Sequence, residues 1–214
     1  MDIAISKEMM NVSKSFVNKK IENVNFASFR PYFNISNSYI LRKLFLILMP
    51  FYNKDWNIVL PKTGSLNQPD LYIPFMSFIT YILIKGMILG MNNEFTPEKL
   101  SLITTRTLFL EIFTIILTKL SSYFIDIKNL YFLDMLAFSG YKYFIIVILL
   151  IIRVKYFNLL IKFYLISALF FFLSRTMKKM IIDEEKTRRK KVYFLFGNVF
   201  LQVLAVSLFC TFFN

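Results

Sequence analysis

The chain has 214 residues, of which 57% are hydrophobic and 18% aromatic, and it carries a formal net charge of +13. A soluble domain of this length cannot bury such an apolar excess in one core, so the composition indicates a membrane protein. The absence of histidine and the single cysteine, Cys210, exclude an internal disulfide and a cysteine zinc site. For the same reason we expect no metal site, and we expect no cofactor. We also expect no nucleic-acid partner, because the basic residues border apolar runs instead of forming a soluble domain.

Segment 1–70 predicts a cytosolic arm. Residues 1–38 are polar and lack a sustained period, so we expect them to be largely disordered, without a cleaved signal peptide. Residues 39–49 are mainly apolar, end at Pro50 and are too short to span a bilayer. Two interpretations stay open for them, an interfacial helix on the cytosolic leaflet or a helix packed on the membrane domain. The remaining residues of the arm predict a loop.

Residues 71–214 contain five apolar runs, each long enough to cross a hydrocarbon core of about 30 Å. In lipid every backbone amide needs a partner within its own segment, so the predicted fold is an all-α, polytopic membrane bundle. We place the spans at 71–91, 102–120, 133–152, 156–173 and 192–213. A tight turn at 153–155 separates the third span from the fourth, because one helix over 133–173 would be about 60 Å long. Thr96-Pro97-Glu98 predicts a helix start.

Lysine and arginine are distributed unevenly between the loops. A cytosolic N-terminus puts eighteen of them on the cytosolic side and three on the lumenal side, and the reverse orientation inverts this ratio. The positive-inside rule therefore predicts a cytosolic N-terminus and a lumenal C-terminus. The segment between the fourth and fifth spans predicts a cytosolic basic face that attracts anionic lipid, or simply a determinant of topology. It comprises Arg175, Lys178, Lys179, Lys186, Arg188, Arg189, Lys190 and Lys191.

Charged residues within the spans need a reason, since each is costly to insert into lipid. Glu111 and Lys142 fall near mid-depth on adjacent spans, and we expect them to pair or to share a polar interior. The alternative is a small transporter or channel that uses Glu111 and Lys142 for proton or ion coupling. Lys85, Arg106 and Lys162 lie nearer the lumenal side, where long side chains can reach the surface.

Asp70, Asp134 and Lys119 lie near the cytosolic edge and predict a second charged cluster. A membrane-embedded lipid enzyme would have to use these three groups. The chain lacks a phosphate loop, a paired-carboxylate site and a nucleophile–base pair, so we expect no enzyme.

Small residues recur inside the spans. Gly86 and Gly90 lie four residues apart, which lets another helix approach closely, either within the chain or from a partner. Gly140 follows Ser139 and permits close packing in the third span. Pro74 lies in the first turn of the first span, where a missing amide proton is tolerated.

Three stretches resemble the Yif family, the Yip-interacting-factor branch of the Yip superfamily of five-span membrane proteins. They are Pro69-Asp70-Leu71-Tyr72-Ile73-Pro74, Phe95-Thr96-Pro97-Glu98 and Leu136-Ala137-Phe138-Ser139-Gly140-Tyr141-Lys142-Tyr143. The resemblance covers about 39–214 in the expected order. The arm is shorter than is usual in the family, and Val203 stands after Gln202 where the family tends to have proline.

The resemblance implies a non-enzymatic membrane scaffold in ER-to-Golgi vesicle transport. It implies a hetero-oligomer with a Yip-family membrane protein, Rab-type small GTPases and vesicle coat or cargo as further partners, and a location in endoplasmic reticulum and Golgi membranes. We therefore single out a set of structural or partner-binding candidates, namely Asp70, Tyr72, Pro74, Gly86, Gly90, Glu111, Gly140, Tyr141 and Lys142.

Overall fold

The computed structural model describes residues 30–33, 35–53, 56, 68–125, 127, 130–152, 158–181 and 188–212. The chain divides into two units, residues 1–34 and 35–214. In the first unit the described residues form a short helix, α2 (Arg30–Phe33). The disorder expected for residues 1–38 concerns a segment of which 1–29 and 34 lie outside the described residues. The second unit holds all the other elements.

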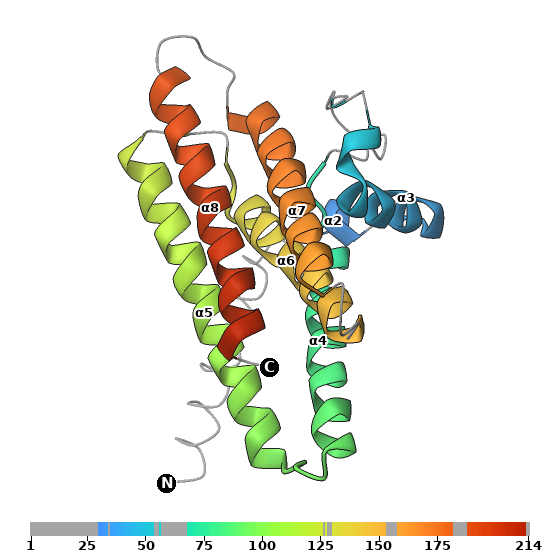
Figure 1. Ribbon diagram of the computed structural model, residues 1–214. Coiled ribbons are helices and arrows are strands. Elements are labelled where there is room, and N and C mark those ends of the chain that lie inside the picture. Colours follow the sequence, from blue (N-terminus) through green and yellow to red (C-terminus); the bar gives the residue numbers. More distant parts are fainter. Residues whose placement is uncertain are drawn as a thin grey trace, which may run out of the picture. The chain divides into compact units, whose positions relative to one another are not determined.

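Five long apolar helices form the body of the second unit, as Figure 1 shows. They are α4 (Tyr72–Met91), α5 (Pro97–Phe124), α6 (Phe132–Ile151), α7 (Asn158–Ile181) and α8 (Arg188–Phe212). Each contains a stretch with a mean hydropathy between 1.6 and 2.0, and each is long enough to cross a membrane. The described part of the chain contains no strand. The predicted all-α, five-span architecture is confirmed.

The helix boundaries follow the local chemistry. The Thr96 hydroxyl accepts a hydrogen bond from the Lys99 amide at 3.2 Å, and Pro97 occupies the first helical position, which confirms the predicted start of α5. Helices α6 and α7 are separate, as the length argument requires, although residues 153–157 between them lie outside the described residues. Helix α7 continues eight residues past the predicted end of its span, because Met177 and Ile181 extend its buried stripe.

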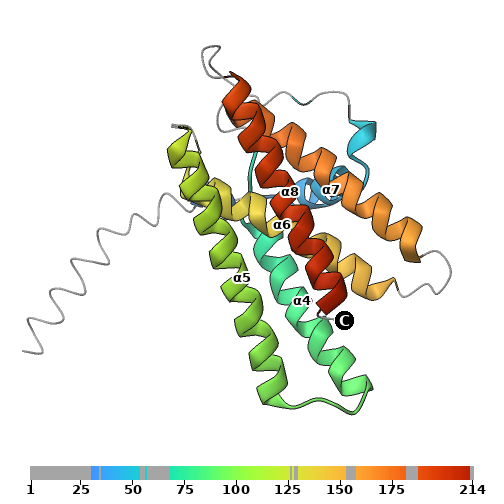
Figure 2. The same cartoon turned by 60° about the vertical axis from the view of Figure 1, so that its left-hand side comes forward.

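Helix α6 is the centre of the bundle. It contacts α4, α5, α7 and α8, and in Figure 2 it lies among these four helices. In its apolar stretch 72% of the residues are buried, against 22–39% in the other four spans. Side chains that α6 presents in any direction therefore meet protein, whereas much of the surface of the other helices faces outward.

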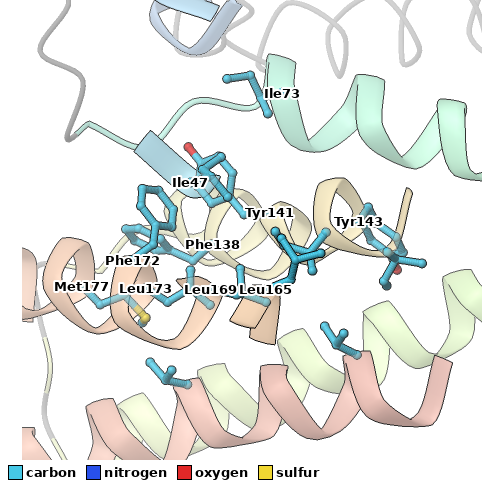
Figure 3. Packing of buried hydrophobic residues seen from close by; sticks show 14 of the residues in the cluster. Ile47, Ile73, Phe138, Tyr141, Tyr143, Leu165, Leu169, Phe172, Leu173 and Met177 are labelled. Atoms are coloured by element: carbon cyan, nitrogen blue, oxygen red, sulfur yellow. The ribbon is translucent and has the colours of Figure 1, made fainter. Parts of the chain in front are cut away.

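Aromatic and branched side chains of α6 and α7 form the densest part of the core. Figure 3 shows Phe138 and Tyr141 beside a stripe of α7 that includes Leu165, Leu169 and Phe172. The three α7 residues recur at helical spacing on one face and are at most 4% exposed. The Tyr141 and Phe172 rings meet edge to face with their centroids 5.3 Å apart.

Helix α3 (Asn37–Leu48) precedes the bundle and packs against α7. The Ser36 hydroxyl caps it by accepting a hydrogen bond from the Tyr39 amide at 3.3 Å. A short 3-10 helix, η2 (Pro50–Tyr52), follows. Of the two interpretations of residues 39–49, the structure shows packing on the membrane domain. The opposite face of α3 nevertheless exposes Leu41 and Phe45, and Met49 directly after the helix is exposed too, so an additional contact with the leaflet stays a prediction.

Candidate functional site

The segment 139–143 of α6 contributes side chains to two buried polar clusters. Successive residues of a helix are rotated by about 100°, so this short segment can reach more than one neighbouring element. Tyr141 faces the segment before α4, whereas Lys142 and Tyr143 face α5. We call the first group the Asp70 cluster (Tyr39, Lys43, Gln68, Asp70 and Tyr141) and the second the Glu111 cluster (Glu111, Ser139, Lys142, Tyr143 and Gln202).

The Asp70 cluster joins α3, α4 and α6. Oδ1 of Asp70 accepts a hydrogen bond from the Ile73 amide at 3.0 Å, so the carboxylate caps the first turn of α4. Its Oδ2 accepts a hydrogen bond from the Tyr141 hydroxyl at 2.8 Å, and the Asp70 amide donates to that same hydroxyl oxygen at 3.0 Å. The Tyr39 hydroxyl reaches Oδ2 at 3.4 Å. One carboxylate thus connects three elements that are far apart in the chain.

Lys43 brings a positive charge into the same cluster. Its side chain is fully buried, and its Nζ donates to the Gln68 carbonyl oxygen at 2.8 Å and lies 3.8 Å from Oδ2 of Asp70. The ammonium also lies 5.5 Å from the centroid of the Tyr141 ring, within cation–π range. Burial lowers the pKa of Lys43 to about 8, although the Asp70 carboxylate acts in the opposite direction. Burial and the same carboxylate raise the pKa of Tyr39.

The Glu111 cluster joins α5, α6 and α8. Nζ of Lys142 lies 2.6 Å from Oε2 of Glu111, and the Tyr143 hydroxyl donates to that oxygen at 2.8 Å. The ammonium also donates to Oε1 of Gln202 at 3.0 Å and to the Ser139 hydroxyl at 3.3 Å. The expected pairing of Glu111 with Lys142 is present. Two opposite charges and their hydrogen-bonding neighbours therefore connect three transmembrane helices.

A close backbone contact lies between the two clusters. A methyl group added at Gly140 would collide with the ring of Pro74 at the start of α4. Both residues are buried. Two of the three stretches that carry the family resemblance therefore meet here, since one contains Asp70 and Pro74 and the other contains Gly140 and Tyr141. Tyr72, in the same stretch as Asp70, is partly buried against the hydrophobic core.

The expected second cluster at the cytosolic edge forms differently from the prediction. Asp70 bonds to residues of α3 and α6, as described above. Asp134 instead accepts a hydrogen bond from the Tyr131 amide at 3.4 Å and helps to cap α6. Nζ of Lys119 lies 5.9 Å from the centroid of the Phe132 ring, in the same first turn of α6. Among the described residues no group of three or more metal-ligating side chains is present.

The two glycines of α4 have different surroundings. A methyl group at Gly86 would lie 3.6 Å from Leu100, so this glycine faces the start of α5. At Gly90 it would meet nothing within 4 Å. Of the three cations expected near the lumenal side, Lys85 is buried, Lys162 is half-buried and Arg106 is exposed, so outward snorkelling is wrong for Lys85.

The predicted basic face is partly present. Arg175 and Lys178 at the end of α7 and Arg189 and Lys190 at the start of α8 are exposed. Lys191 is only 6% exposed, so its place on this face is wrong. The reason is its register, because it precedes the buried α8 residues Phe194, Leu195 and Asn198 by three, four and seven positions. Lys186 and the side chains of Lys179 and Arg188 lie outside the described residues.

Three members of the Asp70 cluster, Tyr39, Lys43 and Gln68, are not among the predicted site residues. Lys43 was counted simply as a cytosolic cation. The signal that identifies it is the spacing of Tyr39, Lys43, Leu46 and Ile47, which places all four on one helical face. A lysine on an otherwise apolar face needs a buried anion, and Asp70 is that anion.

Comparison with known proteins extends the resemblance. The YIF1 family model matches residues 1–210. Protein YIF1A of Danio rerio is 36% identical over 143 residues, which cover 63% of this chain and 47% of the relative. Protein YIF1B of Homo sapiens is 33% identical over 152 residues, or 67% of this chain and 48% of the relative. Protein transport protein YIF1 of Saccharomyces cerevisiae is 33% identical over 177 residues, which cover 75% of this chain and 56% of the relative.

The chain spans about half the length of the relatives it matches. No solved structure matches it significantly. The family model nevertheless covers nearly all of it, including the stretches that form both buried clusters. The chain belongs to the YIF1 family.

Proposed function

We propose that the protein is a non-enzymatic membrane scaffold in ER-to-Golgi vesicle transport, located in endoplasmic reticulum and Golgi membranes with its N-terminus in the cytosol. Two yeast relatives are named protein transport proteins, which supports a role in transport. The distribution of lysine and arginine supports the orientation.

The observation that supports this proposal most directly is that two charged side chains within the spans bond to each other. Glu111 and Lys142 neutralise each other at 2.6 Å, Tyr143 donates a hydrogen bond to Glu111, and Gln202 accepts one from Lys142. Charged groups that serve transport usually face a water-filled path. Here they hold α5, α6 and α8 together, and the cavity of about 310 Å³ between α5 and α8 is lined by neither of them. This arrangement favours a scaffold over a transporter.

The partners in this proposal are a Yip-family membrane protein, which forms a hetero-oligomer with the spans, and Rab-type small GTPases at the cytosolic side, together with vesicle coat or cargo. The exposed cations Arg175, Lys178, Arg189 and Lys190 lie at the cytosolic ends of α7 and α8 on this topology. Such residues attract anionic headgroups by about 1 kcal/mol each near the surface. They supply a basic platform next to the membrane on which an acidic protein surface can also bind.

Purification of the tagged full chain from mild detergent, followed by mass spectrometry, tests the proposal. We expect a Yip-family membrane protein and a Rab-type GTPase among the recovered proteins. The double variant R189Q/K190Q should reduce recovery of the GTPase severalfold, whereas K99Q, which removes an exposed lysine at the opposite ends of the spans, should not. Recovery of neither partner, under conditions that preserve a control membrane complex, would show that the proposal is wrong.

A further inference from the structure

A groove runs between α5 and α8 on the outside of the bundle. The two helices lie side by side in Figures 1 and 2, and the groove encloses about 310 Å³. Its walls include Leu117, Thr118 and Ser121 of α5 and Gly197 and Asn198 of α8. A methyl group at Gly197 would meet nothing within 4 Å, so the floor of the groove is open backbone.

Asn198 points an incompletely bonded amide into this groove. The side chain is 9% exposed, and its one hydrogen bond among the described residues joins Oδ1 to the Thr118 hydroxyl at 3.4 Å. That hydroxyl also lies 2.9 Å from the Thr114 carbonyl oxygen, and it has a single proton to donate. Turning the Asn198 amide by 180° only exchanges the positions of its oxygen and its NH2 group. In either orientation, one end of the Asn198 amide has no hydrogen-bond partner in the described part of the chain.

The depth of Asn198 in the membrane determines which groups can hydrogen-bond its side-chain amide. It follows Arg189 by nine residues on α8, which corresponds to about 14 Å along the helix axis. Arg189 is exposed beside Lys190 and, on the predicted topology, lies at the headgroups. Asn198 therefore lies in the hydrocarbon region, where lipid offers neither donors nor acceptors. An unpaired amide in such surroundings is unfavourable, and a polar side chain of another protein can pair with it.

The shape of the site excludes a symmetric self-contact. In a two-fold dimer the same surface packs against itself, and two facing grooves leave the space between them unfilled. A convex helix fits the groove instead, and the bare backbone at Gly197 lets its axis come close.

We propose that the groove between α5 and α8 receives a transmembrane helix of a second membrane protein, which crosses over Gly197 and hydrogen-bonds the Asn198 amide through an amide or hydroxyl side chain. The groove, the open glycine and the incomplete amide lead to this inference independently of any relative. Only the choice of a Yip-family protein as the partner in the experiment rests on the proposed function.

Site-specific photo-crosslinking in cells tests the contact directly. The full chain carries p-benzoylphenylalanine at Leu201, which lines the groove, and is co-expressed with a tagged Yip-family membrane protein. The control position is the next residue, Phe200, which is 58% exposed and does not line the groove. We expect at least fivefold more crosslink from Leu201, mapped by peptide sequencing to a transmembrane segment of the partner. Crosslinks to lipid alone, to a second copy of the chain, or equally from both positions would overturn the proposal.

Two substitutions test the same groove by affinity. Gly197→Leu fills the open floor and Asn198→Leu removes the amide, so each should reduce recovery of the Yip-family partner at least tenfold. Phe200→Trp adds bulk to an exposed position of the same helix that does not line the groove, and it should leave recovery unchanged. The melting temperature of each purified variant in detergent, within 3 °C of the parent, shows that the bundle is intact.

The two proposals fail in different ways. If the parent chain recovers the partner and both groove variants recover as much, the groove inference is wrong and the proposed function stands. If the parent recovers neither a Yip-family protein nor a Rab-type GTPase, the proposed function is wrong. The groove inference is then tested by the crosslink from Leu201 alone, which should reach a transmembrane segment of another membrane protein and disappear in Asn198→Leu.

Discussion

Replacement of Glu111 by glutamine removes one charge of the buried pair and leaves the other. Loss of one partner from a buried ion pair generally destabilises a protein by about 3–5 kcal/mol, because the remaining charge is uncompensated. In Glu111→Gln the Lys142 ammonium keeps Gln202 at 3.0 Å and Ser139 at 3.3 Å. These dipoles offset part of the loss, so we expect a free energy of unfolding lower by about 3 kcal/mol, at the lower end of that range.

Removal of the other partner, Lys142, should destabilise the bundle more. In Lys142→Met the Glu111 carboxylate keeps only the Tyr143 hydroxyl at 2.8 Å, and its Oε1 has no hydrogen-bond partner among the described residues. We expect a loss of about 4–5 kcal/mol. The double variant E111Q/K142M contains no buried charge at this position. It should therefore lose less than the sum of the two single variants, with a coupling energy of about 2–3 kcal/mol.

The measurement is reversible unfolding of the purified chain in mixed micelles, followed by far-UV circular dichroism as the fraction of sodium dodecyl sulfate rises. Glu94→Gln is the matched control, because it breaks a pair of the same chemistry, Glu94 with Lys99 at 3.4 Å, whose side chains are 61% and 53% exposed. An exposed pair contributes at most about 1 kcal/mol. If Glu111→Gln destabilises no more than Glu94→Gln, or if the double variant equals the sum of the singles, the buried pair does not hold these helices together.

Two further substitutions or conditions have clear expected outcomes. Gly140→Ala should lower the free energy of unfolding by about 1–3 kcal/mol, because the new methyl group collides with Pro74, whereas Gly90→Ala, which meets nothing, should be neutral or stabilising in the same assay. Docking of α3 should strengthen as the pH rises from about 8 to 10.5, since Lys43 has a pKa of about 8 when docked and 10.5 when exposed, and the undocked state therefore holds more protons in this window. The docking free energy increases by up to about 3 kcal/mol across this window. The measurement is the labelling of Ile47→Cys by a thiol reagent in a Cys210→Ser background, with the rate divided by that of free cysteine at the same pH. This relative rate should be lower at pH 9.5 than at pH 7.5, and a higher relative rate at pH 9.5 would contradict the predicted direction.

Hydropathy and charge were sufficient to predict the five spans and the partner of Glu111. The apolar runs have the length of the bilayer, and the alternating direction of the spans places Glu111 and Lys142 at similar depth. The end of α7 escaped this reasoning, because Met177 and Ile181 are buried by protein contacts in a stretch whose cations, Arg175, Lys178 and Lys179, lower the average hydropathy. Hydropathy measures preference for lipid and carries no information on packing against a neighbour.

The Asp70 cluster was harder to predict, because it depends on tertiary contacts over long separations. Asp70 lies 71 residues from Tyr141 along the chain and 31 residues from Tyr39. Its charge and its place before a span led us to group it with Asp134 and Lys119. Its actual partners come from α3, whose docking face is visible in the spacing of its own residues but whose position on the bundle is not.

The ion pair between α5 and α6 has a consequence for biogenesis. Glu111 leaves the ribosome thirty-one residues before Lys142, which corresponds to roughly 2–6 s at translation rates of about 5–20 residues per second. During that interval α5 has an acidic side chain whose cation is still unsynthesised, and the most stable course is for α5 and α6 to enter the bilayer together as a hairpin. Gln202 arrives sixty residues after Lys142, so α8 closes around a pair that is already neutral.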